Sequence, residues 1–260
     1  VVIAVHHLLI DSVSWHIFIE DLHTAVEAYR QGRIPKLPLK TASFQQWAML
    51  IEDYGNSEEL EKERDYWRIV ADEIPNGKLK QYPREEGNVK QVTISLNSAQ
   101  TEQLITEACN TYHTQINDLL LGAMSLTIRE LTGQKQVIIC LEGHGREPIH
   151  VSVDTDRTIG WFTCAYPVLL SCTDSVAEAI IETKEMLRKV PNRGLGFGLL
   201  YPPSVLDDIS IYFNYIGQSQ EVGSVGETTG KENDVGGPIN FNGGIFNGCL
   251  TFQITGGRGW

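Results

Sequence analysis

Residues 6–15 read HHLLIDSVSW, and this stretch decides how the first part of the chain folds. The apolar run VVIAV at 1–5 predicts a buried strand before it, and the spacing of apolar residues after it predicts a helix over 14–30. Gly32 would end that helix. The helix would bury one face, made of apolar residues three or four positions apart: Trp15, Phe18, Leu22, Ala25, Val26 and Tyr29. A strand therefore presents two adjacent histidines at a tight connection.

The histidine pair is compatible with more than one role. Histidine titrates near neutral pH and can take a proton from a substrate when the scaffold orients it, and Asp11 is placed to do so. Alternatively, His6 and His7 are core residues whose ring nitrogens are satisfied by backbone groups. A metal site that also used His16 is disfavoured, because adjacent residues on a strand point to opposite faces.

Composition excludes several classes of protein. The chain has 260 residues, of which 42% are hydrophobic and 21% charged, as in an ordinary globular protein. No apolar run reaches the roughly 18 residues that span a membrane, and the start lacks the basic flank of a signal peptide, so we expect a cytoplasmic protein with no membrane partner. The net charge is −12 and no basic stripe is interleaved with aromatics, so no nucleic acid partner is expected. The five cysteines form no CxxC pair, which argues against a bound metal or a disulfide framework.

Strands and helices are mixed along the chain, without the regular alternation of a doubly wound fold. The chain is long enough for one large domain or two lobes, with a polar, turn-rich boundary at 75–83. We expect both ends to be cut within the fold. The segment 218–238 predicts a long mobile loop, and Ser98 and Asn117 are the expected caps of two helices. Helices are predicted at 43–54, 58–70, 98–109, 119–131 and 176–189, and strands at 89–96, 137–141, 161–170, 209–215 and 250–254.

Four further strings follow HHLLIDSVSW in order: EGHGRE (142–147), RTIGWFT (157–163), PNRGLGFGLL (191–200) and FNYIGQ (213–218). Together the five strings resemble the epimerization domains of nonribosomal peptide synthetases. The condensation-domain superfamily shares the first string, whereas EGHGRE and FNYIGQ are similar to the epimerizing branch.

This resemblance implies a two-lobed, mixed α/β fold of the chloramphenicol acetyltransferase class, here truncated at both ends. Residues 1–75 would be the C-terminal part of the N-lobe and 76–260 most of the C-lobe. The implied reaction is L-to-D epimerization at the α-carbon of an aminoacyl or peptidyl thioester. The substrate would arrive on the phosphopantetheine arm of a peptidyl carrier protein, and no cofactor would bind this chain directly.

The implied partners are a carrier domain upstream in the same chain and neighbouring adenylation and condensation domains. Two other functions stay open. One is a condensation domain that forms a peptide bond between carrier-bound substrates. The other is an inactive relative that serves as a docking module.

Inversion at an α-carbon requires a base, an acid and a group that holds the enolate oxygen. The resemblance implies that His7 is one proton carrier and that His6 points away and packs structurally. Glu142 is the candidate for the other carrier, because a carboxyl at the end of an apolar strand would be desolvated if the strand opens into a site. The alternative is a glutamate that faces solvent. His144 and Arg146 would orient this carboxylate or be surface groups.

The resemblance places Asn214 and Tyr215 beside the reacting carbon. There an amide and a phenol can donate hydrogen bonds to the enolate, a role worth about 3–4 kcal/mol in other enzymes. Otherwise Tyr215 packs in the core.

Three residues are expected to position the site rather than react. Asp11 resembles a structural ion-pair partner that holds the histidine loop. Arg157 would pair with Asp11, with Glu142 or with a phosphate. Trp15 would anchor the helix that follows the histidines.

Overall fold

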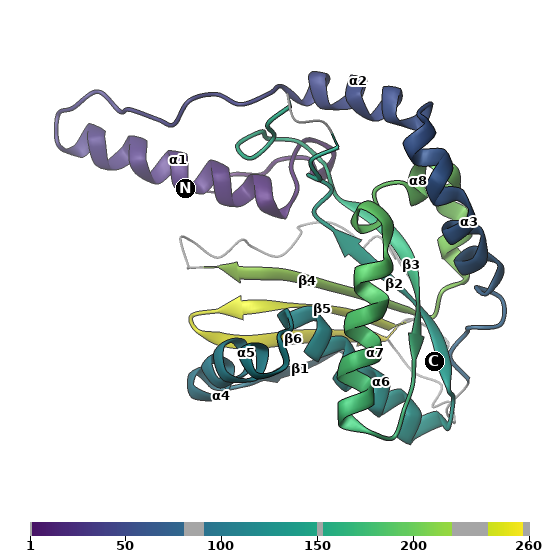
Figure 1. Ribbon diagram of the computed structural model, residues 1–260. Helices are drawn as coiled ribbons and strands as arrows, with labels where there is room; N and C mark the ends of the chain where they lie inside the picture. The colour runs from purple at the N-terminus through teal and green to yellow at the C-terminus, as the bar shows by residue number, and fades with distance from the viewer. Residues whose placement is uncertain (1, 81–90, 150–152, 220–238, 257–260) are drawn as a thin grey trace. The chain divides into compact units, whose positions relative to one another are not determined.

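The computed structural model describes residues 2–80, 91–149, 153–219 and 239–256, and it divides into two compact units (Figure 1). The first unit is Val1–Lys62 with His144–Cys164. The second unit is Glu63–Gly143 with Ala165–Trp260. The assignment of 1–75 and 76–260 to two different lobes stays a prediction.

The helices of the first unit follow the apolar periodicity of the sequence. After a 3-10 turn at His7–Leu9, helix α1 covers Ser12–Arg30 and α2 covers Phe44–Gly55, while α3, Glu58–Asp72, continues into the second unit. Ser43 caps α2 through a capping box with Gln46. Gly32 follows α1 with a φ of +65°, as a residue after a helix end commonly does. The predicted helices at 14–30, 43–54 and 58–70 are thus confirmed to within two residues at each end.

Two expectations about the start of the chain are wrong. No strand forms over 2–5, because none of the described residues pairs with this segment, and Val2 is 96% exposed. The face of α1 predicted to be buried is largely exposed at Leu22, Val26 and Tyr29. Instead, α1 buries a face that carries Ser14, Ile17 and Ala28. Apolar spacing identifies a helix but does not identify the side that meets a partner.

The second unit is built on a mixed sheet with the strand order β1-β6-β5-β4-β2-β3. Strands β2, β4 and β5 pair in parallel, and β6 pairs antiparallel with both β5 and β1. Asn247 and Gly248 join β5 to β6, and both have positive φ, as a two-residue hairpin turn requires. The strands are β1 Gln91–Ser95, β2 Gln136–Gly143, β3 Cys164–Ser171, β4 Ile211–Ser219, β5 Ile239–Phe246 and β6 Cys249–Gly256.

Helix α6 lies along one face of this sheet, and α7 lies beside α6 (Figure 1). Between α6 and the sheet is an apolar cavity of about 500 Å³, lined among others by Met124, Phe213 and Phe252. Four successive β2 residues, 137–140, are at most 1% exposed and form the centre of the core. The helices of this unit are α4 Ser98–Gln103, α5 Cys109–Tyr112, α6 Ile116–Thr132, α7 Val176–Lys189 and α8 Phe197–Leu200, with a π-helical stretch, Leu104–Ala108, between α4 and α5.

Several boundaries differ from those predicted. Asn97, not Ser98, caps α4, and α6 begins at Ile116 after Gln115, so Asn117 is inside the helix. The predicted strand at 161–170 begins only at Cys164. Strand β5 was not predicted, because its two asparagines and its adjacent glycines lower its strand propensity. Residues 220–238 of the predicted loop and 89–90 of the predicted first strand lie outside the described residues, whereas 218 and 219 belong to β4.

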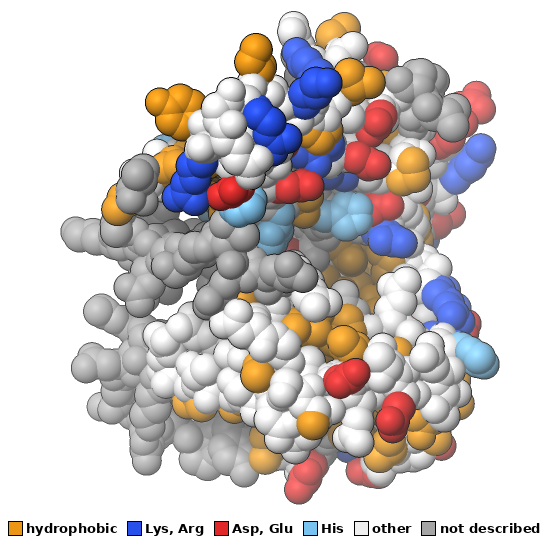
Figure 2. Space-filling model, turned by 90° about the vertical axis from the view of Figure 1, so that its left-hand side faces the viewer, with side chains coloured by type: hydrophobic (Ala, Val, Ile, Leu, Met, Phe, Trp, Pro, Cys, Tyr) orange, Lys and Arg blue, Asp and Glu red, His pale blue; other side chains and the backbone are white. Residues whose placement is uncertain are grey.

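Acidic and basic side chains are mixed on the surface that Figure 2 presents, with histidines among them. Within the described ranges, no helix has the length and apolarity that crossing a membrane requires.

Candidate active site

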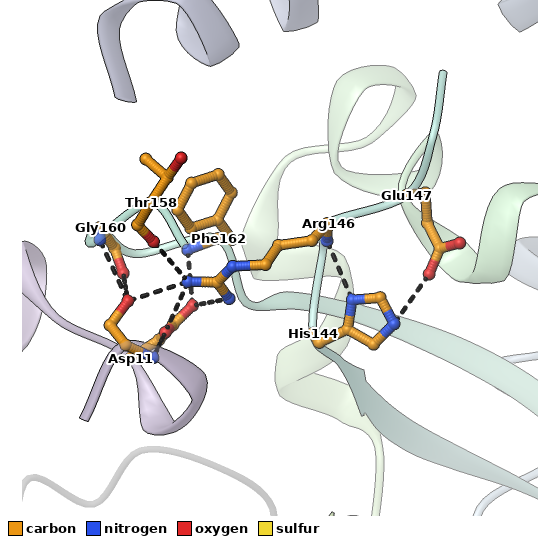
Figure 3. A network of polar contacts seen from close by, with 8 residues as sticks. Asp11, His144, Arg146, Glu147, Thr158, Gly160 and Phe162 are labelled. Atoms are coloured by element: carbon orange, nitrogen blue, oxygen red, sulfur yellow. Dashed lines mark hydrogen bonds and ion pairs between the residues drawn. The ribbon is translucent and has the colours of Figure 1, made fainter. Parts of the chain in front are cut away.

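A buried ion pair joins the histidine loop to the EGHGRE string in the first unit (Figure 3). The Asp11 Oδ2 atom lies 2.8 Å from Arg146 Nη1, and Asp11 Oδ1 lies 3.1 Å from Arg146 Nη2. The two side chains are only 2% and 5% exposed. This two-point contact between a guanidinium and a carboxylate fixes the relative orientation of both groups. The Arg146 side chain is therefore not a surface group: it orients Asp11.

Asp11 also holds two backbone segments. Its Oδ1 accepts a 2.7 Å hydrogen bond from the Ser14 N–H and caps α1, and its Oδ2 accepts one of 3.1 Å from the Phe162 N–H. The Ser14 hydroxyl contacts both the N–H and the carbonyl of Gly160. Three strings that are far apart in the sequence, HHLLIDSVSW, EGHGRE and RTIGWFT, thus meet around one carboxylate.

The environment of Asp11 favours its charged form. Burial alone would raise the pKa of this carboxyl, but hydrogen bonds from Arg146 and Ser14 and the charge of Arg146 outweigh it and hold the pKa below its usual value. The Arg146 guanidinium carbon also lies 4.0 Å from the centre of the Phe162 ring, and Arg146 Nη2 donates to the Thr158 carbonyl.

Gly145 lets the chain pass close to Phe162. Its φ is +68°, and a Cβ at this position would lie 1.7 Å from the Phe162 carbonyl oxygen. Only glycine fits this combination of backbone conformation and contact.

We therefore expect Gly145→Ala to destabilise the first unit by about 1–3 kcal/mol from backbone strain alone, with the clash adding to this cost. Gly55→Ala is the matched control, because a Cβ added to Gly55 would have nothing within 4 Å of it. Hydrogen exchange of the amides in α1 would report the loss. Equal protection in the two variants would contradict the expectation.

The two histidines lie on the surface of the described structure. His6 is exposed and its Nδ1 accepts a 3.2 Å hydrogen bond from the Leu8 N–H, so it does not pack in the core as predicted. His7 is also exposed, and its ring centre lies 5.6 Å from that of Trp161. Asp11 makes no hydrogen bond to His7 and holds the loop through Arg146 instead. His7 is thus accessible to a substrate, with an aromatic ring as its neighbour.

His144 has partners within its own string. Its Nδ1 accepts a 3.0 Å hydrogen bond from the Arg146 N–H, and its Nε2 lies 3.2 Å from Glu147 Oε1 (Figure 3). His144 therefore helps to form the EGHGRE turn. These two contacts are with Arg146 and Glu147 and not with Glu142, which His144 was expected to orient.

The other two positioning candidates lie near α1. Arg157 binds the carboxylates of Glu20 and Asp21 on α1 rather than Asp11 or Glu142. Trp15 is half-buried and packs edge-on against Phe18, with ring centres 5.8 Å apart.

The second unit brings together the ends of two parallel strands. Leu141 on β2 pairs with Phe213 on β4, and one residue further Asn214 Nδ2 donates a 2.7 Å hydrogen bond to Glu142 Oε2. Glu142 is exposed, so in the described structure it lacks the desolvation expected for it. At this open strand end, the carboxylate can take up a proton, and the amide can donate a hydrogen bond to an anionic oxygen.

Tyr215 lies on the opposite face of β4 from Asn214, because successive strand residues alternate. Its ring stacks on Phe252, with centres 6.5 Å apart, as the core alternative predicted. Burial, followed by the nearby Cys109, raises the pKa of this phenol above its usual value, so it stays protonated at neutral pH. The structure does not bring Tyr215 to the Glu142–Asn214 pair, and a part for its phenol in the reaction stays a prediction.

Sequence reasoning missed Arg146 as the partner of Asp11. The available signal was chemical: a carboxylate buried at a helix start requires a cation, and both EGHGRE and RTIGWFT contain an arginine. Among the described residues, no group of three histidine, cysteine or acidic side chains is gathered so that it could hold a metal ion.

The fold and these strings define a condensation domain. The condensation-domain family matches residues 1–236, and the chain belongs to this family. Its mixed α/β fold is the two-lobed chloramphenicol acetyltransferase-like fold expected from the sequence. It is similar to surfactin synthase subunit 1 of Bacillus subtilis (strain 168), with 36% identity over 97% of this chain and 8% of the relative. It is 41% identical to bacitracin synthase 2 of Bacillus licheniformis, over 83% of this chain and 9% of the relative.

Among solved structures, the epimerization domain from the third module of tyrocidine synthetase B superposes with a TM-score of 0.84. The identity is 31%, and the match covers 98% of this chain and 62% of that one. The first condensation domain of the calcium-dependent antibiotic synthetase gives a TM-score of 0.73 at 17% identity, covering 97% of this chain and 59% of that one, and shows the fold alone. The chain thus spans less than two thirds of these structures and a small part of the synthases.

Proposed function

We propose that this domain inverts the α-carbon of an aminoacyl or peptidyl thioester held on the phosphopantetheine arm of a carrier protein, within a nonribosomal peptide synthetase. The observation that carries the proposal is the 2.7 Å hydrogen bond between Asn214 and Glu142. It joins the two strings, EGHGRE and FNYIGQ, that resemble the epimerizing branch. The higher TM-score and identity with an epimerization domain support the same assignment.

The chemistry requires two proton carriers, one for each face of the α-carbon. A thioester makes the α-proton more acidic than a free carboxylate does, so no metal or cofactor need bind this chain. Glu142 is one proposed carrier, because its exposed carboxylate lies at the end of β2 and the hydrogen bond from Asn214 orients it. His7 is the other, on a loop that the Asp11–Arg146 pair holds in place.

Asn214 has a second role in this scheme. Its amide nitrogen carries two hydrogens, of which the bond to Glu142 uses one. The other can be donated to the enolate oxygen that forms when the α-proton leaves. The expected partners are the carrier domain that delivers the thioester and the adjacent adenylation and condensation domains of the synthetase.

The proposal predicts loss of an isotopic label. An epimerase breaks the α carbon–hydrogen bond at every turnover, so a carrier-bound L-aminoacyl or peptidyl group deuterated at that carbon should lose deuterium to water as the D-form appears. Mass spectrometry of the hydrolysed acyl group would follow the label in the full-length synthetase. Peptide bond formation with full retention of label would instead indicate a condensation domain. Retention without any product would indicate an inactive docking module.

A further inference from the structure

The sheet of the second unit is almost free of charge. In the described structure its six strands carry a single charged side chain, Glu142, although the chain contains 33 acidic and 21 basic residues. One face of the sheet meets α6 and is apolar, so charges are excluded there by burial. On β4, β5, β6 and β1 the opposite face is polar, whereas on β2 the same face is apolar and buried at Ile138 and Cys140. Burial within this unit does not explain the lack of charge at the exposed residues of the polar part.

A row of uncharged polar side chains crosses that face from the candidate site. Asn214 pairs with Asn242, Asn242 with Gln253, and Gln253 with Thr93. Directly paired residues project to the same face, so these four side chains form one row that begins beside Glu142. Asn242, Gln253 and Thr93 are exposed. Their neighbours on the same face include further amides and hydroxyls: Gln91, Ser95, Tyr212, Asn240, Thr251 and Thr255.

A surface that only meets water has no reason to exclude lysine and glutamate. A surface from which an uncharged ligand displaces water does have a reason to exclude charged side chains, because a desolvated, unpaired charge is costly. A carboxamide side chain carries both a donor and an acceptor, as a peptide group does. The chemistry of the row therefore matches an extended chain of uncharged amides.

We propose that Asn242 and Gln253 hydrogen-bond the backbone amides of a peptidyl chain, so that the substrate of this domain is a peptidyl rather than an aminoacyl thioester. This rests on the proposed epimerase function. Strands are about 4.8 Å apart, so Gln253 lies about 10 Å from Asn214 across the sheet. An extended peptide covers this distance with about three residues. With its reacting carbon at Glu142 and Asn214, the preceding residues of the chain would lie over Asn242 and Gln253.

The test compares two substrates on the full-length synthetase. Loss of α-deuterium is measured from a carrier loaded with an aminoacyl group and from one loaded with a tripeptidyl group that ends in the same residue. We expect the double variant Asn242→Ala and Gln253→Ala to lower the ratio of kcat/KM for tripeptidyl over aminoacyl substrate by about 5- to 100-fold, the effect of two lost hydrogen bonds. Gln136→Ala, an exposed side chain at the far end of β2, should leave the ratio unchanged.

The outcomes separate this proposal from the proposed function. An unchanged ratio of kcat/KM would overturn the proposal of a peptidyl substrate. An equal loss of kcat/KM for both substrates would also overturn it, and would indicate that the row binds the phosphopantetheine arm, whose amides both substrates carry. Failure of the wild-type protein to exchange either label would overturn the epimerase function, and this proposal with it. The pair Asn242→Val and Gln253→Val, which favours strands and cannot hydrogen-bond the peptide, should give the same loss of ratio and excludes misfolding as its cause.

Discussion

Replacing Glu142 with glutamine is expected to slow epimerization by about 10²- to 10⁴-fold, the usual cost of losing a general acid or base. The substitution keeps an oxygen that can accept the hydrogen bond from Asn214, so the local structure is preserved. It removes only the group that carries the proton. Chiral analysis of the acyl group released from the carrier would give the rate for the full-length synthetase.

Glu182→Gln provides the matched control for this variant. Glu182 is exposed on α7, and its replacement should leave the rate at the wild-type value. His7→Ala, which removes the other proposed proton carrier, should fall in the same range as Glu142→Gln. A Glu142→Gln protein that epimerizes at nearly the wild-type rate would remove Glu142 from the mechanism and favour the condensation alternative.

Arg146→Met is expected to destabilise the first unit by about 3–5 kcal/mol, because it leaves the Asp11 carboxylate buried without its cation. Hydrogen exchange of α1 amides in the full-length protein would report this loss locally. Arg188→Met is the control, since Arg188 pairs with Glu185 while both side chains are more than half exposed, and such surface pairs contribute about 0–1 kcal/mol. Equal effects of the two substitutions would contradict the structural role of Arg146.

The same ion pair makes the first unit sensitive to acid. The pKa of Asp11 is held below its ordinary value of 3.8, so the pair contributes its full stability above that pH and loses it as the pH falls through the lower folded-state pKa. Protection of α1 amides should therefore decline on acidification below about pH 4, and an Asp11→Asn variant should lack this part of the decline. An increase in the protection of α1 amides on acidification would contradict this expectation.

Local patterns predicted the elements that depend on local interactions. The local sequence pattern placed α2, α3 and α7, and β2 followed from its continuous apolar run, whereas the two predicted caps, Ser98 and Asn117, were wrong. Partners remote in the sequence were not predictable in this way. The side of α1 that is buried depends on the 144–164 segment, and the strand expected at 1–5 has no partner among the described residues.

The candidate site shows the same division. Asp11, Glu142 and Asn214 stood out from their strings, but Asp11 and Arg146 are 135 residues apart, and no local signal joined them. The alternation of side chains along a strand is enough to place Tyr215 and Asn214 on opposite faces of the strand that contains FNYIGQ. The uncharged row depends on the register of β4, β5 and β6, which requires the three-dimensional pairing.

The meeting of three strings around Asp11 limits how this domain can be recombined with its relatives. The Asp11 carboxylate contacts Ser14, Arg146 and the Phe162 backbone, which come from both halves of a discontinuous unit. A chimera with a junction between α1 and 144 would take these contacts from two parents, whose turns at Gly145 and Gly160 need not match. Junctions that keep residues 11–14 and 144–162 from one parent would preserve the whole cluster. A chimera must therefore take these two segments, which are far apart in the sequence, from the same parent.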